Sequence, residues 1–276
     1  MITRLQTRLS ALREQKRCGL APYVTAGDGG METTLAVLRA LDRVGVACVE
    51  LGLPFSDPVA DGPVLQAAAE RALAAGASFD RTLELITRFR RETPAGEVPI
   101  VLMGYANPLL RRGWEASCAA LAVAGADGVL VADLPIEEGA PLALAAKKAG
   151  IAAIFFAAPT TADERLAAAV KLSRGFLYAI GRLGVTGARV DIDPTQRGFL
   201  DRVRAAAGDL PVAVGFGLST AEQVRAVASH ADLAIVGSAM VSRIHRAFTA
   251  SGGDALAAAR AAEDFARELT KGLETS

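Results

Sequence analysis

The stretch "AVAGADGVLVAD" (residues 122–133) contains the end of a helix-period segment, a glycine and then a short apolar strand. The same order appears in "KKAGIAAIFFAAP" (147–159), and again where Gly45, a candidate helix C-cap, precedes "VACVELG" (46–52). Apolar runs of this kind are typical of strands that are buried on both faces. The recurring unit therefore predicts a parallel sheet covered by helices.

Eight such strands can be placed along the chain. They are residues 20–25, 47–52, 99–104, 128–132, 152–157, 176–180, 211–215 and 233–237. Eight strand–helix units in 276 residues predict a (β/α)8 (TIM) barrel with an extra N-terminal helix. A doubly wound sheet is the alternative, but no nucleotide-binding fingerprint follows the first strand. No linker divides the chain, so we expect residues 1–276 to form a single TIM-barrel domain.

The composition argues against several classes of protein. Thirty Lys and Arg residues balance thirty Asp and Glu residues, unlike the basic excess of nucleic-acid and membrane-surface proteins. The apolar runs are too short to span a bilayer, and the polar first fifteen residues do not resemble a signal peptide. Three widely spaced cysteines form neither a disulfide framework nor a zinc pattern, so we expect a reducing, cytoplasmic location.

Active sites of TIM barrels lie at the C-terminal ends of the strands, and polar residues gather there in this sequence. Glu50 and Asp61 belong to the second predicted strand and the loop after it, Asn107 and Asp133 follow the third and fourth strands, and Tyr178 lies in the sixth. These positions are the candidates for chemistry.

The two histidines, His230 and His245, lie in late helical segments, and we interpret them as surface or helix-packing residues. Without a well-placed histidine or cysteine, we expect neither a hydrolase triad nor a metal site. Acid–base chemistry would therefore depend on carboxylates.

Glu50 is the strongest candidate for that role. Strand alternation places Cys48, Glu50 and Gly52 on one face and Val49 and Leu51 on the other, so the carboxyl should point into the barrel mouth. A carboxyl in such surroundings keeps its proton more readily than one in water, as a general acid requires. The alternative is a buried carboxylate paired with an arginine.

Asp61 lies in "ADGP", a turn sequence in which aspartate is often only a turn former or a helix N-cap. The local sequence leaves this alternative open beside a functional role. Asp57, in "SDPV", is interpreted as structural.

Two glycine clusters suit an anion. "GFGLS" (215–219) and "GSAM" (237–240) each lead into a predicted helix, and backbone N–H groups at a helix start bind phosphate. TIM barrels often place such a site after strands 7 and 8. "GRLGVTGAR" (181–189) is interpreted as a flexible lid over the site.

Several motifs, in order, resemble the tryptophan synthase alpha chain family. They are "PYVTAGD", "VELGLPFSDPVADGP", "GVLVADLP", "GVTGAR", "VGFGLS" and "IVGSA". The resemblance runs from about residue 18 to residue 245, and its motif at the second strand is long and specific. It implies a TIM barrel that cleaves indole-3-glycerol phosphate to indole and glyceraldehyde 3-phosphate.

The resemblance also implies a role for individual residues. Glu50 matches the general acid–base glutamate of the family, and Asp61 matches the aspartate that contacts the indole N–H. The implied substrate-binding residues are Tyr23, Met103, Leu130, Tyr178, Thr186 and Phe216, and the implied phosphate-binding residues are Gly187, Gly217, Gly237 and Ser238.

A partner is implied as well, namely the beta chain, which carries pyridoxal phosphate and receives indole, in an expected alpha2beta2 tetramer. Pro54 and Asp57 would face that partner, and this chain would need no cofactor. Two positions depart from the family pattern: Gly29 replaces the usual proline, and Gly181 replaces a serine of the loop after the sixth strand. Loop closure and its coupling to the beta chain could therefore differ.

Three other interpretations compete with a lyase that works in a complex. A free-standing indole-3-glycerol-phosphate lyase would turn over fast without a partner. A non-catalytic homologue that only activates a beta chain would not need both Glu50 and Asp61. Another phosphosugar barrel, such as an isomerase, would need no indole pocket.

Overall fold

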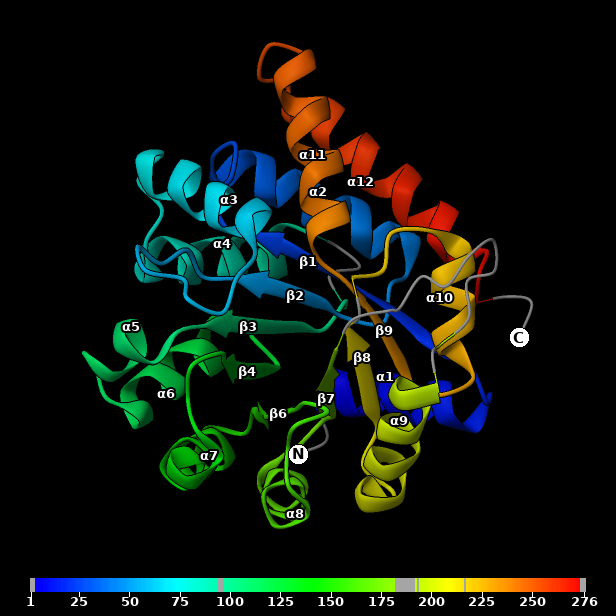
Figure 1. The fold of residues 1–276 in the computed structure, drawn as a ribbon. Coiled ribbons are helices and arrows are strands. Elements are labelled where there is room, and N and C mark those ends of the chain that lie inside the picture. Colours follow the sequence, from blue (N-terminus) through cyan, green and yellow to red (C-terminus); the bar gives the residue numbers. More distant parts are fainter. Residues whose placement is uncertain (1–2, 94–96, 182–191, 193, 216, 274–276) are drawn as a thin grey trace.

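Parallel strands form one sheet that curves into a barrel (Figure 1). The computed structural model describes residues 3–93, 97–181, 192, 194–215 and 217–273. The strands are β1 (Gly19–Thr25), β2 (Val49–Gly52), β3 (Ile100–Gly104), β4 (Gly128–Val131), β5 (Ala152–Ile154), β6 (Phe156–Ala157), β7 (Leu177–Ile180), β8 (Val212–Gly215) and β9 (Leu233–Val236).

The barrel closes at Phe155. Hydrogen-bonded neighbours run in the order β5-β4-β3-β2-β1-β9-β8-β7-β6, so the two ends of the sheet are β5 and β6. These two strands are consecutive in the chain and are separated only by Phe155, whose carbonyl accepts a hydrogen bond from the Tyr178 N–H at 3.0 Å. The strands therefore surround a common axis, and their C-terminal ends open at one side.

Helices surround the strands, and several are stacked on one another, such as α2 against α12 (Figure 1). Those in the first half are α1 (Arg4–Glu14), α2 (Met31–Val44), α3 (Pro63–Ala74), α4 (Phe79–Glu92), α5 (Ala106–Leu110) and α6 (Trp114–Ala124). They are followed by η1 (Ile136–Glu138), α7 (Gly139–Ala149), α8 (Asp163–Leu172), α9 (Pro194–Ala207), α10 (Ala221–Ala228), α11 (Ser238–Ala250) and α12 (Ala255–Thr270).

Strand alternation divides the apolar residues between two cores. Val49 and Leu51 of β2 belong to the core between strands and helices, whereas Cys48, which directly precedes β2, belongs to the core inside the barrel. Leu5 and Leu9 of α1 also pack into the inner core. Helix α1 thus covers one end of the barrel, and the inward-facing Glu50 lies beyond it along the same interior.

The structure confirms the predicted TIM barrel, all eight predicted strands and the extra N-terminal helix α1. One predicted strand, 152–157, is broken at Phe155 into β5 and β6, because its first half pairs with β4 and its second half with β7. The sequence did not predict that two helices, and not one, follow β2 and β9, or that the short α5 lies between β3 and α6.

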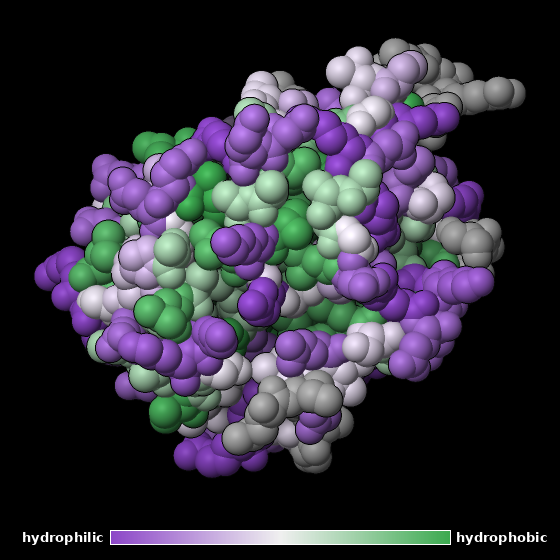
Figure 2. All heavy atoms as spheres, turned by 90° about the horizontal axis from the view of Figure 1, so that it is seen from below, coloured by the Kyte–Doolittle hydropathy of each residue, from purple (hydrophilic) through white to green (hydrophobic). Residues whose placement is uncertain are grey.

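Seen from below, most of the surface is hydrophilic, and hydrophobic residues are visible in a hollow between hydrophilic ones (Figure 2). Of the helices that the structure describes, none is long and apolar enough to cross a membrane. The apolar half of the composition is thus used largely in the two cores.

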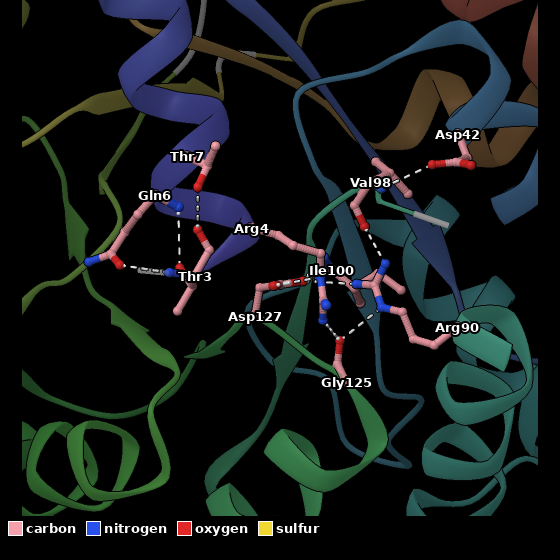
Figure 3. Close-up of polar contacts among 10 residues, drawn as sticks. All are labelled: Thr3, Arg4, Gln6, Thr7, Asp42, Arg90, Val98, Ile100, Gly125 and Asp127. Carbon is pink, nitrogen blue, oxygen red and sulfur yellow. Dashed lines mark hydrogen bonds and ion pairs between the residues drawn. The ribbon is translucent and has the colours of Figure 1, made fainter. Parts of the chain in front are cut away.

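A network of charged groups fixes α1 to the base of the barrel (Figure 3). The buried Asp127 carboxylate accepts hydrogen bonds from Arg90 and from the Ile100 N–H, both at 2.9 Å, and lies 3.1 Å from the Arg4 guanidinium. Arg4 and Arg90 both donate to the Gly125 carbonyl as well. Asp127 therefore joins α1, α4 and β3 at one buried point.

This network predicts that substitutions of Asp127 and Arg4 lower the free energy of unfolding by unequal amounts. Asp127→Asn should lower the free energy of unfolding by about 3 kcal/mol, because Arg90 would lose the charge that compensates its burial. Arg4→Ala should cost about 1 kcal/mol or less, since the Arg4 side chain is 37% exposed. Urea unfolding of the two variants measures both values, and equal losses would contradict the central place of Asp127.

Candidate active site

Strand β2 carries Glu50 into the barrel mouth. The side chain is 6% exposed, and its Oε1 atom has no hydrogen-bond partner in the part of the chain that the structure describes. Burial, and to a lesser extent the charge of Asp61, raises the pKa of Glu50 to about 8. No arginine pairs with Glu50 among the described residues, so the carboxyl keeps its proton at neutral pH and is not half of an ion pair.

Asp61 lies in the loop between β2 and α3. It is not the N-cap of α3, since Gly62 holds that position and no side chain caps the helix. Burial raises the pKa of Asp61, and a hydrogen bond from the Tyr105 hydroxyl acts in the opposite direction. Asp61 is therefore oriented toward the strand ends and does not serve as a helix cap. Asp57 is exposed and accepts a hydrogen bond from the Ser56 hydroxyl at 2.5 Å.

The two carboxyls line one cavity of about 200 Å³ at the C-terminal ends of the strands. Of the predicted substrate-binding residues, the cavity brings together Tyr23, Met103 and Tyr178. Its further lining residues are Ala60, Leu65, Ala132, Phe156, Ile180, Ile235 and Gly237. This lining is mostly apolar, as a flat aromatic ligand requires.

Leu130 does not line this cavity. It is fully buried in the inner core, and Ala132, two residues later and just after the end of β4, lines the cavity instead. Thr186, Gly187 and Phe216 lie outside the described residues. Gly181 lies at the end of β7, where its N–H donates to the Gly215 carbonyl at 3.3 Å.

The two helix starts after β8 and β9 differ in what is already bonded to them. At α10, Thr220 and Gln223 form a capping box, and Gln223 also accepts the Ser219 N–H. At α11 the N-cap is Gly237, and no side chain caps the helix. Gly237 lines the cavity and Ser238 follows it, so α11 is the helix start that offers free N–H groups to an anion there.

Gly217 has a φ of +72°, and no described atom lies within 4 Å of where its Cβ would be. The residue lies in the loop between β8 and α10. Its backbone is thus open for the close approach of another group.

Tyr105 is a site residue that sequence reasoning missed. Its ring is 2% exposed and stacks on Phe55 with centroids 5.2 Å apart. Its hydroxyl accepts the Ala60 N–H at 3.1 Å and hydrogen-bonds to Asp61. Tyr105 directly follows β3, so the rule that strand ends carry the site could have included it, but nothing in the sequence indicates its contact with the β2 loop.

Comparison with known proteins identifies the family. The family model described as "Tryptophan synthase alpha chain" matches residues 9–272. The chain belongs to this family. A tryptophan synthase alpha chain from Alkalilimnicola ehrlichii is 48% identical over 244 residues, which cover 88% of both chains.

Solved structures of the family have the same fold. Tryptophan synthase subunit alpha from Legionella pneumophila is 33% identical, with a TM-score of 0.87 over 100% of both chains. A chain of a tryptophan synthase crystal structure from Mycobacterium tuberculosis is 31% identical, with a TM-score of 0.84 over 98% of both chains. The barrel described above is thus that of solved tryptophan synthase chains.

One departure from the pattern of the alpha chain family has a structural correlate. Gly29 has a φ of +78°, a conformation that proline, with φ fixed near about −65°, cannot adopt. The Gly29 carbonyl accepts a hydrogen bond from the Thr33 hydroxyl at 2.7 Å in the first turn of α2. The loop after β1 therefore follows a backbone path that a proline at this position would exclude.

The raised pKa of Glu50 predicts a pH-dependent stability. Between about pH 4.5 and pH 8 the folded chain holds a proton that the unfolded chain has lost, so folding stability falls as the pH rises through this window. Glu50→Gln removes this loss and should exceed the wild type at pH 8.5 by at least about 1.4 kcal/mol, one pKa unit.

Urea unfolding of both proteins at pH 4.5 and pH 8.5 measures the effect. The gain of the variant should be larger at pH 8.5 than at pH 4.5, because the other titrating groups are common to both proteins. A gain that does not change with pH would show that Glu50 is ionised in the folded chain.

Two cavity tyrosines lie over glycines of the neighbouring strands. A Cβ at Gly52 would overlap the Tyr23 hydroxyl, and a Cβ at Gly215 would lie 2.5 Å from the Tyr178 hydroxyl. Gly52→Ala should therefore lower the free energy of unfolding by about 1–3 kcal/mol. Adding Tyr23→Leu should restore part of this loss, whereas Gly198→Ala, which meets no atom within 4 Å, should cost nothing. An unrestored loss would contradict a clash with Tyr23.

Proposed function

We propose that this chain is the alpha subunit of tryptophan synthase and cleaves indole-3-glycerol phosphate to indole and glyceraldehyde 3-phosphate, in the last steps of L-tryptophan biosynthesis. The observation that carries the proposal is the protonated, unpaired Glu50 in an apolar cavity that also holds Asp61. Membership of the alpha chain family supports the choice of substrate and reaction.

The reaction requires a proton cycle that one carboxyl can complete. Glu50 donates its proton to C3 of the indole ring, which leaves a positive indolenine. The resulting carboxylate then accepts the proton of the adjacent side-chain hydroxyl. As that O–H bond breaks, the carbonyl forms, the C–C bond to C3 breaks and its electrons neutralise the ring. Glu50 is protonated again at the end, so it acts as acid and then as base.

Asp61 supports this cycle through the ring nitrogen. Its carboxylate accepts the indole N–H and stabilises the positive charge that protonation of C3 creates. For this role Asp61 must be ionised while Glu50 is protonated. The rate should therefore be highest between the pKa of Asp61 and the value of about 8 for Glu50, and should fall on either side.

The remaining contacts hold the substrate in register. The aromatic ring would lie among the apolar residues Met103, Leu65 and Phe156. The phosphate would lie at the start of α11, where the N–H groups after Gly237 carry no side-chain cap. Fixing both ends of the substrate places C3 beside the carboxyl that protonates it. Every group that the mechanism uses belongs to this chain, so we assign it no cofactor and no metal.

A beta chain with bound pyridoxal phosphate is the proposed partner, in an alpha2beta2 tetramer that passes indole between subunits. Pro54 and Asp57 belong to the loop that would face it. In the same region Val59 is 81% exposed and Leu110 is 49% exposed, although both are apolar. The buried, unpaired cysteines fit the reducing cytoplasm in which we place the complex.

Indole release from indole-3-glycerol phosphate tests the proposed function. Glu50→Gln should lower kcat by a factor of about 100 or more, because the amide can neither donate nor accept the proton. Glu115→Gln makes the same change at an exposed residue that pairs with Lys148 on the outside of the barrel, and it should leave kcat unchanged. Equal activity of wild type and Glu50→Gln would refute the assigned role.

Repeating the assay with and without a cognate beta chain distinguishes the related interpretations. Slow turnover alone and faster turnover with the beta chain is the expected result. Fast turnover of the isolated chain would indicate a free-standing lyase that releases indole. Activation of the beta chain without any indole release would indicate a non-catalytic homologue.

A further inference from the structure

Asp133 lies outside the cavity but is joined to it. It follows β4, and its Oδ1 atom accepts a hydrogen bond from the Ala106 N–H at 2.7 Å. Ala106 is the first residue of α5, and the N-cap residue Tyr105 provides no side-chain cap. Asp133, from the next strand–helix loop, therefore caps α5 and places a negative charge at its N-terminus.

The capped end of α5 is adjacent to the tyrosine that orients Asp61. Tyr105 is the N-cap of α5, so the hydrogen bond at Ala106 restrains the backbone of Tyr105 directly. The Tyr105 ring is buried, and its hydroxyl bonds to the Ala60 N–H and to Asp61. One chain of contacts therefore leads from Asp133 through α5 and Tyr105 to Asp61.

No other described side chain replaces Asp133 at this point. The Tyr105–Phe55 stack holds the ring plane, but Phe55 is on the β2 loop that Tyr105 itself must anchor. α5 has only five residues, so a helix of this length depends strongly on its contacts. Loss of the Asp133 cap should therefore loosen Tyr105, and not only α5.

We propose that Asp133 is a positioning residue for the cleavage reaction, which acts by capping α5 and thereby fixing Tyr105 and the Asp61 carboxylate. The inference rests on the proposed function of Asp61 and adds a residue that makes no contact with the substrate. It identifies the loop after β4 as part of the support of the catalytic loop after β2.

The test is the pH profile of indole release by Asp133→Ala. kcat should fall by about fivefold to tenfold, a rise of about 1–1.4 kcal/mol in the activation barrier, because Asp61 would no longer be held in place. The acidic limb of the profile should move to higher pH, because the Tyr105 hydrogen bond that lowers the pKa of Asp61 would weaken. The titratable groups that interact with Asp61 are Glu50, Tyr23, Tyr105 and Tyr178. Asp133→Ala leaves all four in place but removes the Asp133 charge, which in addition to burial raises the pKa of Tyr105, so the charge and the cap must be separated by a variant that keeps only the cap.

Two further variants distinguish an effect on the position of Asp61 from a general loss of stability. Asp133→Asn keeps an oxygen that accepts the Ala106 N–H and should keep the acidic limb close to that of the wild type. Asp254→Ala removes an exposed aspartate that caps α12 through the Leu256 N–H, far from the cavity. It should lower stability by a comparable amount without moving the limb.

A double-mutant cycle with Tyr105→Phe completes the test. Tyr105→Phe should move the acidic limb as Asp133→Ala does, and the double variant should show no further shift. Additive shifts, or an unchanged limb in Asp133→Ala, would overturn the inference while wild-type indole release still supports the proposed function. No indole release by the wild type, with or without a beta chain, would overturn the proposed function itself.

Discussion

A carboxyl without a counter-charge inside the barrel is the constraint around which the site is built. Glu50 lies on an inner strand face, and no lysine or arginine contacts it in the part of the chain that the structure describes. Its polar neighbours, Tyr23 and Tyr178, supply no counter-charge either, and burial raises the pKa of both hydroxyls above the ordinary value. The barrel thus keeps a proton available at neutral pH at the expense of stability, as active sites often do.

At the opposite end of the barrel a second buried acid, Asp127, has partners that Glu50 lacks. Asp127 is as buried as Glu50, but Arg90, Arg4 and the Ile100 N–H all face its carboxylate. Asp127 thus has partners that compensate its charge and joins three elements, whereas Glu50 is unpaired. Burial alone therefore does not distinguish a functional carboxyl from a structural one, but the presence or absence of compensating partners does.

Features that depend on neighbouring residues in the sequence could be predicted, whereas contacts between residues far apart in the chain could not. Strand periodicity and glycine punctuation are local, so the eight strands, the barrel and the inward direction of Glu50 could be predicted from the sequence. Closure at Phe155 and the contact between Tyr105 and Asp61 depend on residues that are distant in the chain. Leu130 lies below the cavity that its predicted role would place it in, since alternation gives the face of a strand but not the depth at which the cavity begins.

The uncapped start of α11 has a consequence for how the site tolerates sequence change. The phosphate site that we propose there is made of peptide N–H groups, so it has no charged side chain that a single substitution could delete. Most changes at neighbouring positions leave the amides in place, and only added bulk or a lost N–H would block the site. Such a site can persist while the residues around it diverge, whereas Glu50 has no backbone substitute.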